Sequence, residues 1–185
     1  IYAGLKRMPY TETKQPGWIE ILENYYAIQL SLNQIRGINS YTSLLIQRIV
    51  MDGFEQGKSI QEISEEIQIM GGQLFTRAER IARTTIIGAS NAGSLEGAIS
   101  TGLNVKKQWL ATPDSRTRGT EPEDKWNHRQ FLDNPLIVDV KEPFVIQGIE
   151  KGQPKIDSIQ FPGDPTGSPG NIINCRCTQI YITED

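Results

Sequence analysis

The sequence has little of the chemistry on which many enzymes and secreted proteins depend. Its 185 residues include two cysteines and one histidine. Two cysteines cannot form the set of disulfides that holds small secreted domains together. One histidine, without a paired-carboxylate motif, leaves general acid–base catalysis with few candidate groups. The composition therefore favours a binding or structural protein in a reducing compartment over an enzyme.

Long apolar runs and an excess of positive charge are also missing. No apolar run approaches the roughly 20 residues that a membrane-spanning helix needs, so we expect no membrane partner. The formal net charge is −3, and the basic residues are dispersed, so binding to DNA is expected to be weak. No signal peptide is recognisable. The chain begins with Ile1 rather than Met, which we interpret as a fragment or a processed product of a longer protein.

Residues 18 to about 100 have the apolar spacing of successive helices. Ser59 and Glu62 form a capping box at the start of the third helix, and Gly71 and Gly72 end it. The fourth helix has a stripe of small residues that we expect to pack against the following domain, with Ala89, Ala92 and Gly93 at the contact. The predicted helices cover residues 18–35, a segment from about 41, residues 59–70 and residues 76–100.

After residue 102 the pattern changes to short strands separated by prolines and glycines. The segment "QFPGDPTGSPGN" is interpreted as a rigid connector, because its prolines lack the amide donors that a phosphate-binding loop needs. The predicted fold class is α+β, with an N-terminal helical segment (1–75) followed by a small, loop-rich α+β domain (76–185). The expected strands are 105–112, 136–140, 144–147 and 178–182, with the first and last in one sheet.

Both cysteines lie in one short motif, Cys175-Arg176-Cys177. In an extended strand the two thiols share a face and are near the upper separation limit for a disulfide. Two thiolates on one face suit a zinc ion. His128 is then the natural third ligand, and a carboxylate, Asp114 or Asp124, is a candidate for the fourth. The alternative is that no cofactor binds and the cysteines pack as small apolar residues.

The segment "PDSRTRG" places Arg116 and Arg118 two residues apart, after Asp114. Two guanidinium groups on one face suit a carboxylate or a phosphate ligand. An internal salt-bridge network is the alternative, and we favour it in an acidic protein. We expect Arg176, on the face opposite the cysteines, to pair with Asp164 or Asp114.

The order of these motifs resembles that of a known family. An "IARTTIIGASNAG" helix, a strand with tryptophan, "DSRTR", a histidine, "PGDP" and "NCRC" follow one another. This order resembles the phage minor head proteins, that is, the Mu protein F-like head morphogenesis family, from about residue 79 to residue 182. The chain departs from the family at Thr85, where a glutamate is usual, and by an insertion before His128. The resemblance picks out Arg83, Asn91, Trp109, Arg116, Arg118, Asp164 and Arg176 as motif residues, beside Asp114, His128, Cys175 and Cys177.

The resemblance implies a non-enzymatic role in head morphogenesis. The expected partners are the portal protein and capsid components. The expected location is the virion, at the capsid interior or portal region, and the host cytoplasm during assembly. Family members that have a toxin carry it in an additional C-terminal domain, which we do not expect in a chain that ends shortly after Cys177. The alternative is a small metal-dependent enzyme that acts on nucleic acid or a nucleotide, which a metal with an open, water-bearing position would favour.

Overall fold

The structure, a computed structural model, describes residues 40–71, 75–121 and 123–183. The helix expected over residues 18–35 lies outside the described residues. The described part is helical at its start and combines short strands with two short helices afterwards, which confirms the predicted α+β class. The elements are α2 (Ser40–Glu55), α3 (Ile60–Gly71), α4 (Phe75–Ser100), β1 (Val105–Leu110), α5 (Gln130–Asp133), β2 (Ile137–Asp139), β3 (Phe144–Glu150), β4 (Gln153–Ile159), α6 (Pro169–Ile172) and β5 (Thr178–Thr183).

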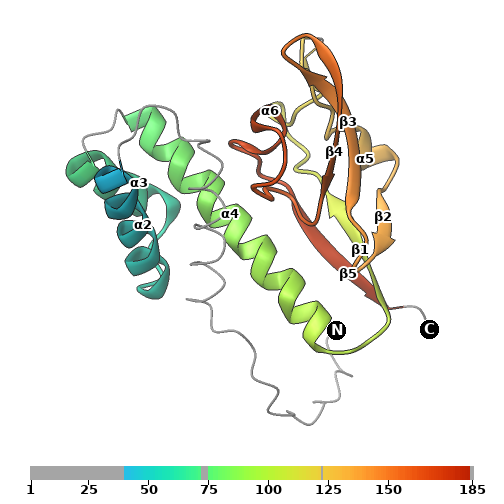
Figure 1. Cartoon of the computed structure of the whole chain (residues 1–185), viewed down its shortest axis with the longest axis horizontal. Helices are drawn as coiled ribbons and strands as arrows, with labels where there is room; N and C mark the ends of the chain where they lie inside the picture. Colours follow the sequence, from blue (N-terminus) through green and yellow to red (C-terminus); the bar gives the residue numbers. More distant parts are fainter. Residues whose placement is uncertain (1–39, 72–74, 122, 184–185) are drawn as a thin grey trace.

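Helices α2 and α3 pack against the first half of α4 (Figure 1). The predicted capping box begins α3: the Ser59 amide donates to Glu62 Oε2 at 2.7 Å, and the Glu62 amide donates to Ser59 Oγ at 3.2 Å. Apolar side chains spaced by three and four residues supply the core of this cluster. The buried core residues are Ile46, Ile49, Val50, Ile63, Ile67, Ala78, Ile81 and Ala82. None of the described helices is long and apolar enough to cross a membrane.

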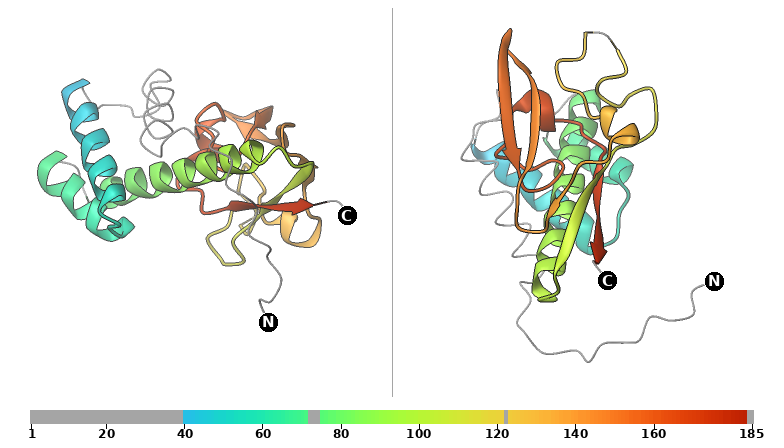
Figure 2. Two further views of the ribbon diagram at one scale, coloured as in Figure 1. Left: turned by 90° about the horizontal axis from the view of Figure 1, so that it is seen from below. Right: turned by 90° about the vertical axis from the view of Figure 1, so that its right-hand side faces the viewer.

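Helix α4 belongs to both parts of the molecule. It is 26 residues long, and its second half lies along the strands (Figure 2). Ala89 is fully buried against Phe161, Met51 and Phe54, so the predicted contact of the small face with the C-terminal domain is confirmed at this residue. Gly163 has a φ of +86°, and a Cβ there would lie 3.1 Å from the Gly88 Cα. The loop containing Gly163 thus approaches the helix backbone directly.

The strands form a three-stranded and a two-stranded antiparallel sheet. The first has the order β2-β1-β5, and the second is the β3-β4 hairpin. Strand β1 pairs with β5 from Val105↔Thr183 to Leu110↔Thr178. The expectation that residues 105–112 and 178–182 share a sheet is therefore confirmed, although β1 ends at Leu110.

Two features of the C-terminal part differ from the sequence-based expectations. Strand β4 was not predicted, because it is mostly polar and exposed and contains Pro154. Proline is compatible with a strand that has a neighbour on one side only, and β4 pairs with β3 alone in the described sheets. The segment 160–171, expected to be a connector, folds into a turn around Asp164 and then into the start of α6. Neither feature has the alternating apolar pattern of a half-buried strand.

Candidate functional site

The two cysteines lie in the core between the sheets. They precede β5 in an extended segment where alternate side chains are buried: Cys175 and Cys177 are each 3% exposed, while Arg176 faces the other way. Asn174 turns the chain into this segment with a φ of +61°, a conformation that asparagine tolerates better than most residues. The core around the thiols consists of Trp109, Ala111, Trp126, Phe144, Ile146 and Ile159.

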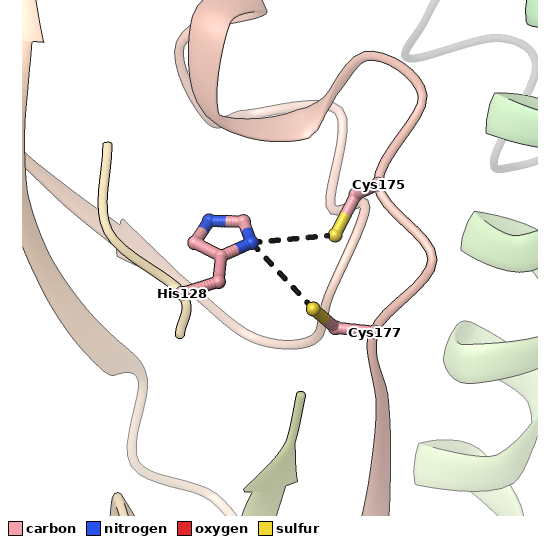
Figure 3. Close-up of side chains that lie close together, drawn as sticks. All are labelled: His128, Cys175 and Cys177. Atoms are coloured by element: carbon pink, nitrogen blue, oxygen red, sulfur yellow. Dashed lines mark hydrogen bonds between the residues drawn. The ribbon is translucent and has the colours of Figure 1, made fainter. Parts of the chain in front are cut away.

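His128 completes a buried cluster with the two thiols. Its Nδ1 lies 3.6 Å from Cys175 Sγ and 3.6 Å from Cys177 Sγ (Figure 3). The three possible ligand atoms lie within 4.8 Å of one another, and all three residues are buried. The Trp109 ring and the imidazole pack edge to face, with a centroid distance of 5.0 Å. The structure thus brings together three of the five residues that the sequence suggested as candidate metal ligands.

The surroundings of the two thiols favour a negative charge on one of them and oppose it on the other. A hydrogen bond between them lowers the pKa of Cys175 to about 7, against the opposing effect of burial, and the charge of Arg118 lowers it further. The same hydrogen bond and burial raise the pKa of Cys177. Both cysteines are free. Of the two thiols, Cys175 is therefore the one on which a negative charge is favoured.

Hydrogen bonds among buried side chains fix the orientation of the imidazole through its Nε2 atom. His128 Nε2 lies 2.6 Å from Asn171 Oδ1, and Asn171 Nδ2 donates to Asp157 Oδ2 at 2.8 Å. The Asp157 carboxylate also accepts from the Ser168 amide and hydroxyl at 2.7 and 2.8 Å. A carboxylate only accepts, so the Asn171 amide group must face Asp157 and its oxygen must face the imidazole. His128 therefore carries its proton on Nε2 and presents the Nδ1 lone pair to the thiols.

Arg118 positions both halves of the cluster. Its carbonyl accepts from the His128 amide at 2.9 Å. Its guanidinium donates to the carbonyl of Ile173, which lies just before the cysteine motif. Arg118 therefore connects the histidine segment to the cysteine segment through both its backbone and its side chain.

The carboxylates proposed as a fourth ligand have other partners. Both oxygens of Asp114 accept from Arg176, which is one of the two pairings expected for that arginine. These bonds hold the pKa of Asp114 well below its usual range. Asp124 accepts from the amides of Gly119 and Glu121 at 2.7 and 3.2 Å. The "DSRTR" turn is thus an internal network, with Arg116 of the same turn 3.8 Å from Asp114 and largely exposed.

The remaining motif residues connect α4 and the "PGDP" loop to the cysteine segment. Arg83 donates to Asn174 Oδ1 at 2.8 Å. Asn91 Nδ2 donates to the carbonyls of Pro162 and Cys177 at 2.8 and 3.1 Å, and Asn91 Oδ1 accepts from the Thr178 hydroxyl at 2.8 Å. Asp164, the other candidate partner of Arg176, accepts from amides and a hydroxyl of its own loop. These residues hold the backbone around the cluster in place.

A small pocket opens onto the cluster. It is lined by polar and cationic residues, and none of the described lining residues carries a carboxylate. A bound group would therefore meet guanidinium groups, the imidazole and the two thiols, and among the described lining residues only the imidazole and the thiols could act as a general base. The lining residues are Thr112, Arg116, Thr117, Arg118, His128, Asn174, Cys175, Arg176 and Cys177.

Two residues of the site were not identified from the sequence, Asn171 and Asp157. Asp157 is a charged residue that shares the buried face of β4 with Ile159, and an acidic residue in such a position signals a buried polar partner. That signal can be recognised only when the strand is recognised. Asn171 lies in the segment that was interpreted as a connector.

Comparison with known proteins gives a family and two relatives. The profile of the family described as "Phage Mu protein F like protein" matches residues 45–180. The chain is 33% identical over 138 residues to the protein named NAD(+)--arginine ADP-ribosyltransferase EFV of Enterococcus faecalis, covering 73% of this chain and 25% of that one. It is 27% identical over 153 residues to protein YqbB of Bacillus subtilis, covering 83% of this chain and 45% of the relative. The chain thus spans less than half the length of either relative. No solved structure matches it.

Proposed function

Since the chain belongs to the phage Mu protein F-like family, which supports a structural role related to the phage head, we propose that it acts in capsid assembly without catalysis. Its partners in this proposal are the portal protein and capsid components, and its place is the virion, at the capsid interior or portal region. The observation that carries the proposal is the family match, which runs from α2 into β5.

The use of the motif residues supports a structural role. Asn91 donates to the backbone carbonyl of Pro162, Asp164 accepts from a backbone amide of its own loop, and Arg83 donates to the side-chain oxygen of Asn174. Arg118 and Arg176 have partners within the domain as well. Motif residues that form hydrogen bonds and ion pairs within the domain stabilise its structure. Such residues suit a rigid assembly module, which presents a surface and requires no reactive group.

A metal-dependent enzyme that acts on nucleic acid or a nucleotide is the second candidate. The cluster supplies three ligand residues, and catalytic zinc sites have three protein ligands and one open position. The absence of a carboxylate among the described residues of the pocket argues against it. The chain covers only a quarter of the Enterococcus relative. We therefore do not assign the ADP-ribosyltransferase activity in that relative's name to the part that this chain matches.

The assembly role can be tested in the phage or prophage that encodes the chain. We expect purified procapsids and mature heads to contain the chain at low copy number by mass spectrometry, and deletion of its gene to lower the yield of normal heads. Complementation with the intact gene is the control. Chemical cross-linking in purified heads should join the chain to the portal protein.

Each outcome bears on one part of the proposal. Absence of the chain from heads, together with normal head yield after deletion, would overturn the assembly role. Cross-links to the major capsid protein alone would refute the portal contact and keep the capsid role. Metal-dependent cleavage of single-stranded DNA, RNA or a nucleotide by the purified chain, abolished by His128→Ala, would favour the enzyme.

A further inference from the structure

We propose that His128, Cys175 and Cys177 bind one Zn²⁺ ion, which joins the segment containing His128 to the segment before β5. Such a site is compatible with the proposed role in head assembly and does not depend on it. It rests on the distances between the three ligand atoms, on the orientation of the imidazole and on the position of the ligands in the fold.

The distances fit a tetrahedral ion. With Zn–S bonds of about 2.3 Å and Zn–N bonds of about 2.0–2.1 Å, the nitrogen–sulfur edge of a tetrahedron is about 3.6 Å. Both Nδ1–Sγ distances in the structure are 3.6 Å. Both nitrogen–sulfur distances therefore already have the length expected for one ion bound to all three atoms.

The imidazole is held in the tautomer that a metal ligand requires. The chain Asp157–Asn171–His128 leaves the Nδ1 lone pair facing the thiols. One lone pair accepts one S–H hydrogen bond well, yet two sulfur atoms converge on it at equal distance. A cation bound to the nitrogen and to both sulfurs accounts for this convergence. A histidine that binds a metal usually has its other ring nitrogen fixed in this way by a second set of residues.

Charge and burial also favour the ion. Two thiolates and one Zn²⁺ form a neutral group, which can be buried without an uncompensated charge. Binding would release the proton of each protonated thiol to solvent. The pocket lined by Thr112 and Thr117 lies on the accessible side of the cluster, where one water molecule can occupy the fourth position. The described residues around the cluster supply no fourth protein ligand.

The position of the ligands explains what the ion would do. His128 follows the long loop after β1, and the cysteines precede β5. The ion would therefore connect two segments that are far apart in sequence, in a domain whose two sheets are small and whose connections are long. A metal that binds only the folded arrangement contributes its binding free energy to folding.

The first experiment uses the whole chain and Zn²⁺ alone. We expect one zinc per chain by elemental analysis after purification, and a lower melting temperature after a chelator that is reversed by added Zn²⁺. Co²⁺ in place of Zn²⁺ should give the intense ultraviolet absorption of cobalt–thiolate bonds. Less than 0.1 zinc per chain, with no change in melting temperature on adding Zn²⁺, would overturn the proposal.

Variants then assign the ligands. Cys175→Ser, Cys177→Ser and His128→Ala should each abolish stoichiometric binding. Asn171→Ala should weaken zinc affinity about 10- to 100-fold, because Asn171 orients a ligand without touching the ion. Asp114→Asn should leave the stoichiometry at one, since Asp114 pairs with Arg176. Ile159→Val is the matched control: it perturbs the same core without altering a ligand.

The results separate this proposal from the proposed function. Zinc retained by the ligand variants would place the ion elsewhere and overturn the site. Loss of zinc in the Ile159→Val control would mean that binding follows general stability rather than these ligands, and would equally contradict the assignment. A chain without zinc that is still found in phage heads would refute the metal site alone.

Discussion

The side-chain amide of Asn91 offers the sharpest test of how α4 is attached to the C-terminal domain. Asn91 is 2% exposed, and its NH₂ group donates to the carbonyls of Pro162 and Cys177. Asn91→Asp replaces this double donor with an oxygen of nearly the same size. The variant therefore changes hydrogen bonding and charge while leaving the packing volume almost unaltered.

The cost follows from the two ways in which the variant can fold. A buried carboxylate that faces two carbonyl oxygens is strongly unfavourable, so the group must take up a proton. Protonation of a carboxyl with a pKa of about 3.9 costs about 4 kcal/mol at pH 7. The single proton serves one carbonyl, and the other loses its donor at a cost of about 1–3 kcal/mol. We therefore expect a loss of about 6 kcal/mol at pH 7, which is comparable with the whole stability of many domains.

The pH dependence identifies the cause. The folded-state pKa of the new carboxyl is raised, so the variant is most stable at low pH and loses stability as the pH rises. Between pH 7 and pH 5 it should recover about 2.7 kcal/mol relative to the parent. Urea unfolding followed by tryptophan fluorescence measures this, because Trp109 and Trp126 are both buried in the C-terminal core.

Asn127→Asp is the matched control. Asn127 is exposed, and its side-chain oxygen accepts from the Gln130 amide at 3.0 Å. The same chemical change there preserves the acceptor, so stability should change by less than about 1 kcal/mol. If the two variants unfold with the same free energy and the same pH profile, the amide of Asn91 does not hold the two carbonyls, and the reasoning is refuted.

Three further predictions concern other contacts of the C-terminal part. Gly163→Ala should lower the free energy of unfolding in urea by about 2–4 kcal/mol, because it adds the close approach to Gly88 to the strain of a positive φ. Gly102 has a φ of +68° and open space around it, so Gly102→Ala should show only the strain, about 1–2 kcal/mol. Equal losses in the two variants would contradict the close approach. Burial lowers the pKa of Lys107 to about 8, so the buried lysine loses its charge as the pH rises. Between about pH 7 and pH 10 the free energy of unfolding of the parent should therefore rise by up to about 2.5 kcal/mol relative to Lys107→Met. Parallel pH profiles of the two proteins would contradict this. Arg176 lowers the pKa of Asp114, so the Asp114 contribution is present at neutral pH and lost as the pH falls below about 4. Asp114→Asn should therefore be less stable than the parent at pH 7 and lose less stability in acid, whereas an unchanged acid profile would show that the ion pair contributes nothing.

Local patterns made the helices and the cysteine motif predictable from the sequence. The capping box at Ser59 fixed the start of α3, because it depends on residues three apart. The alternation of Cys175, Arg176 and Cys177 gave the correct facing of all three side chains, because the geometry of an extended chain is local. The pairing of Arg176 with Asp114 was one of two alternatives that charge allowed.

The support of His128 depends on contacts that no local pattern reveals. Asn171 and Asp157 approach the imidazole only because the turn after β4 leads into α6. Likewise, the sequence does not distinguish Asp114 from Asp124 as a candidate ligand. In the structure Asp114 accepts from Arg176 and Asp124 accepts from the Gly119 amide, and the positions of these donors depend on the whole domain. Residue chemistry suggested the histidine and the thiols, and tertiary structure determined which neighbours they have.

The pairing of β1 with β5 sets an order of events during synthesis of the chain. Residues 105–110 leave the ribosome long before residues 178–183, which form the longer of the two strand ladders of β1. Until then β1 has only the three-residue strand β2 beside it, and Trp109 lacks the cover of the cysteine segment. The contacts among α2, α3 and α4 are local and can form on the nascent chain, whereas non-local strand pairing is slow. The three-stranded sheet is therefore completed only after β5 has been synthesised, and until then β1 keeps an unpaired edge to which chaperones can bind.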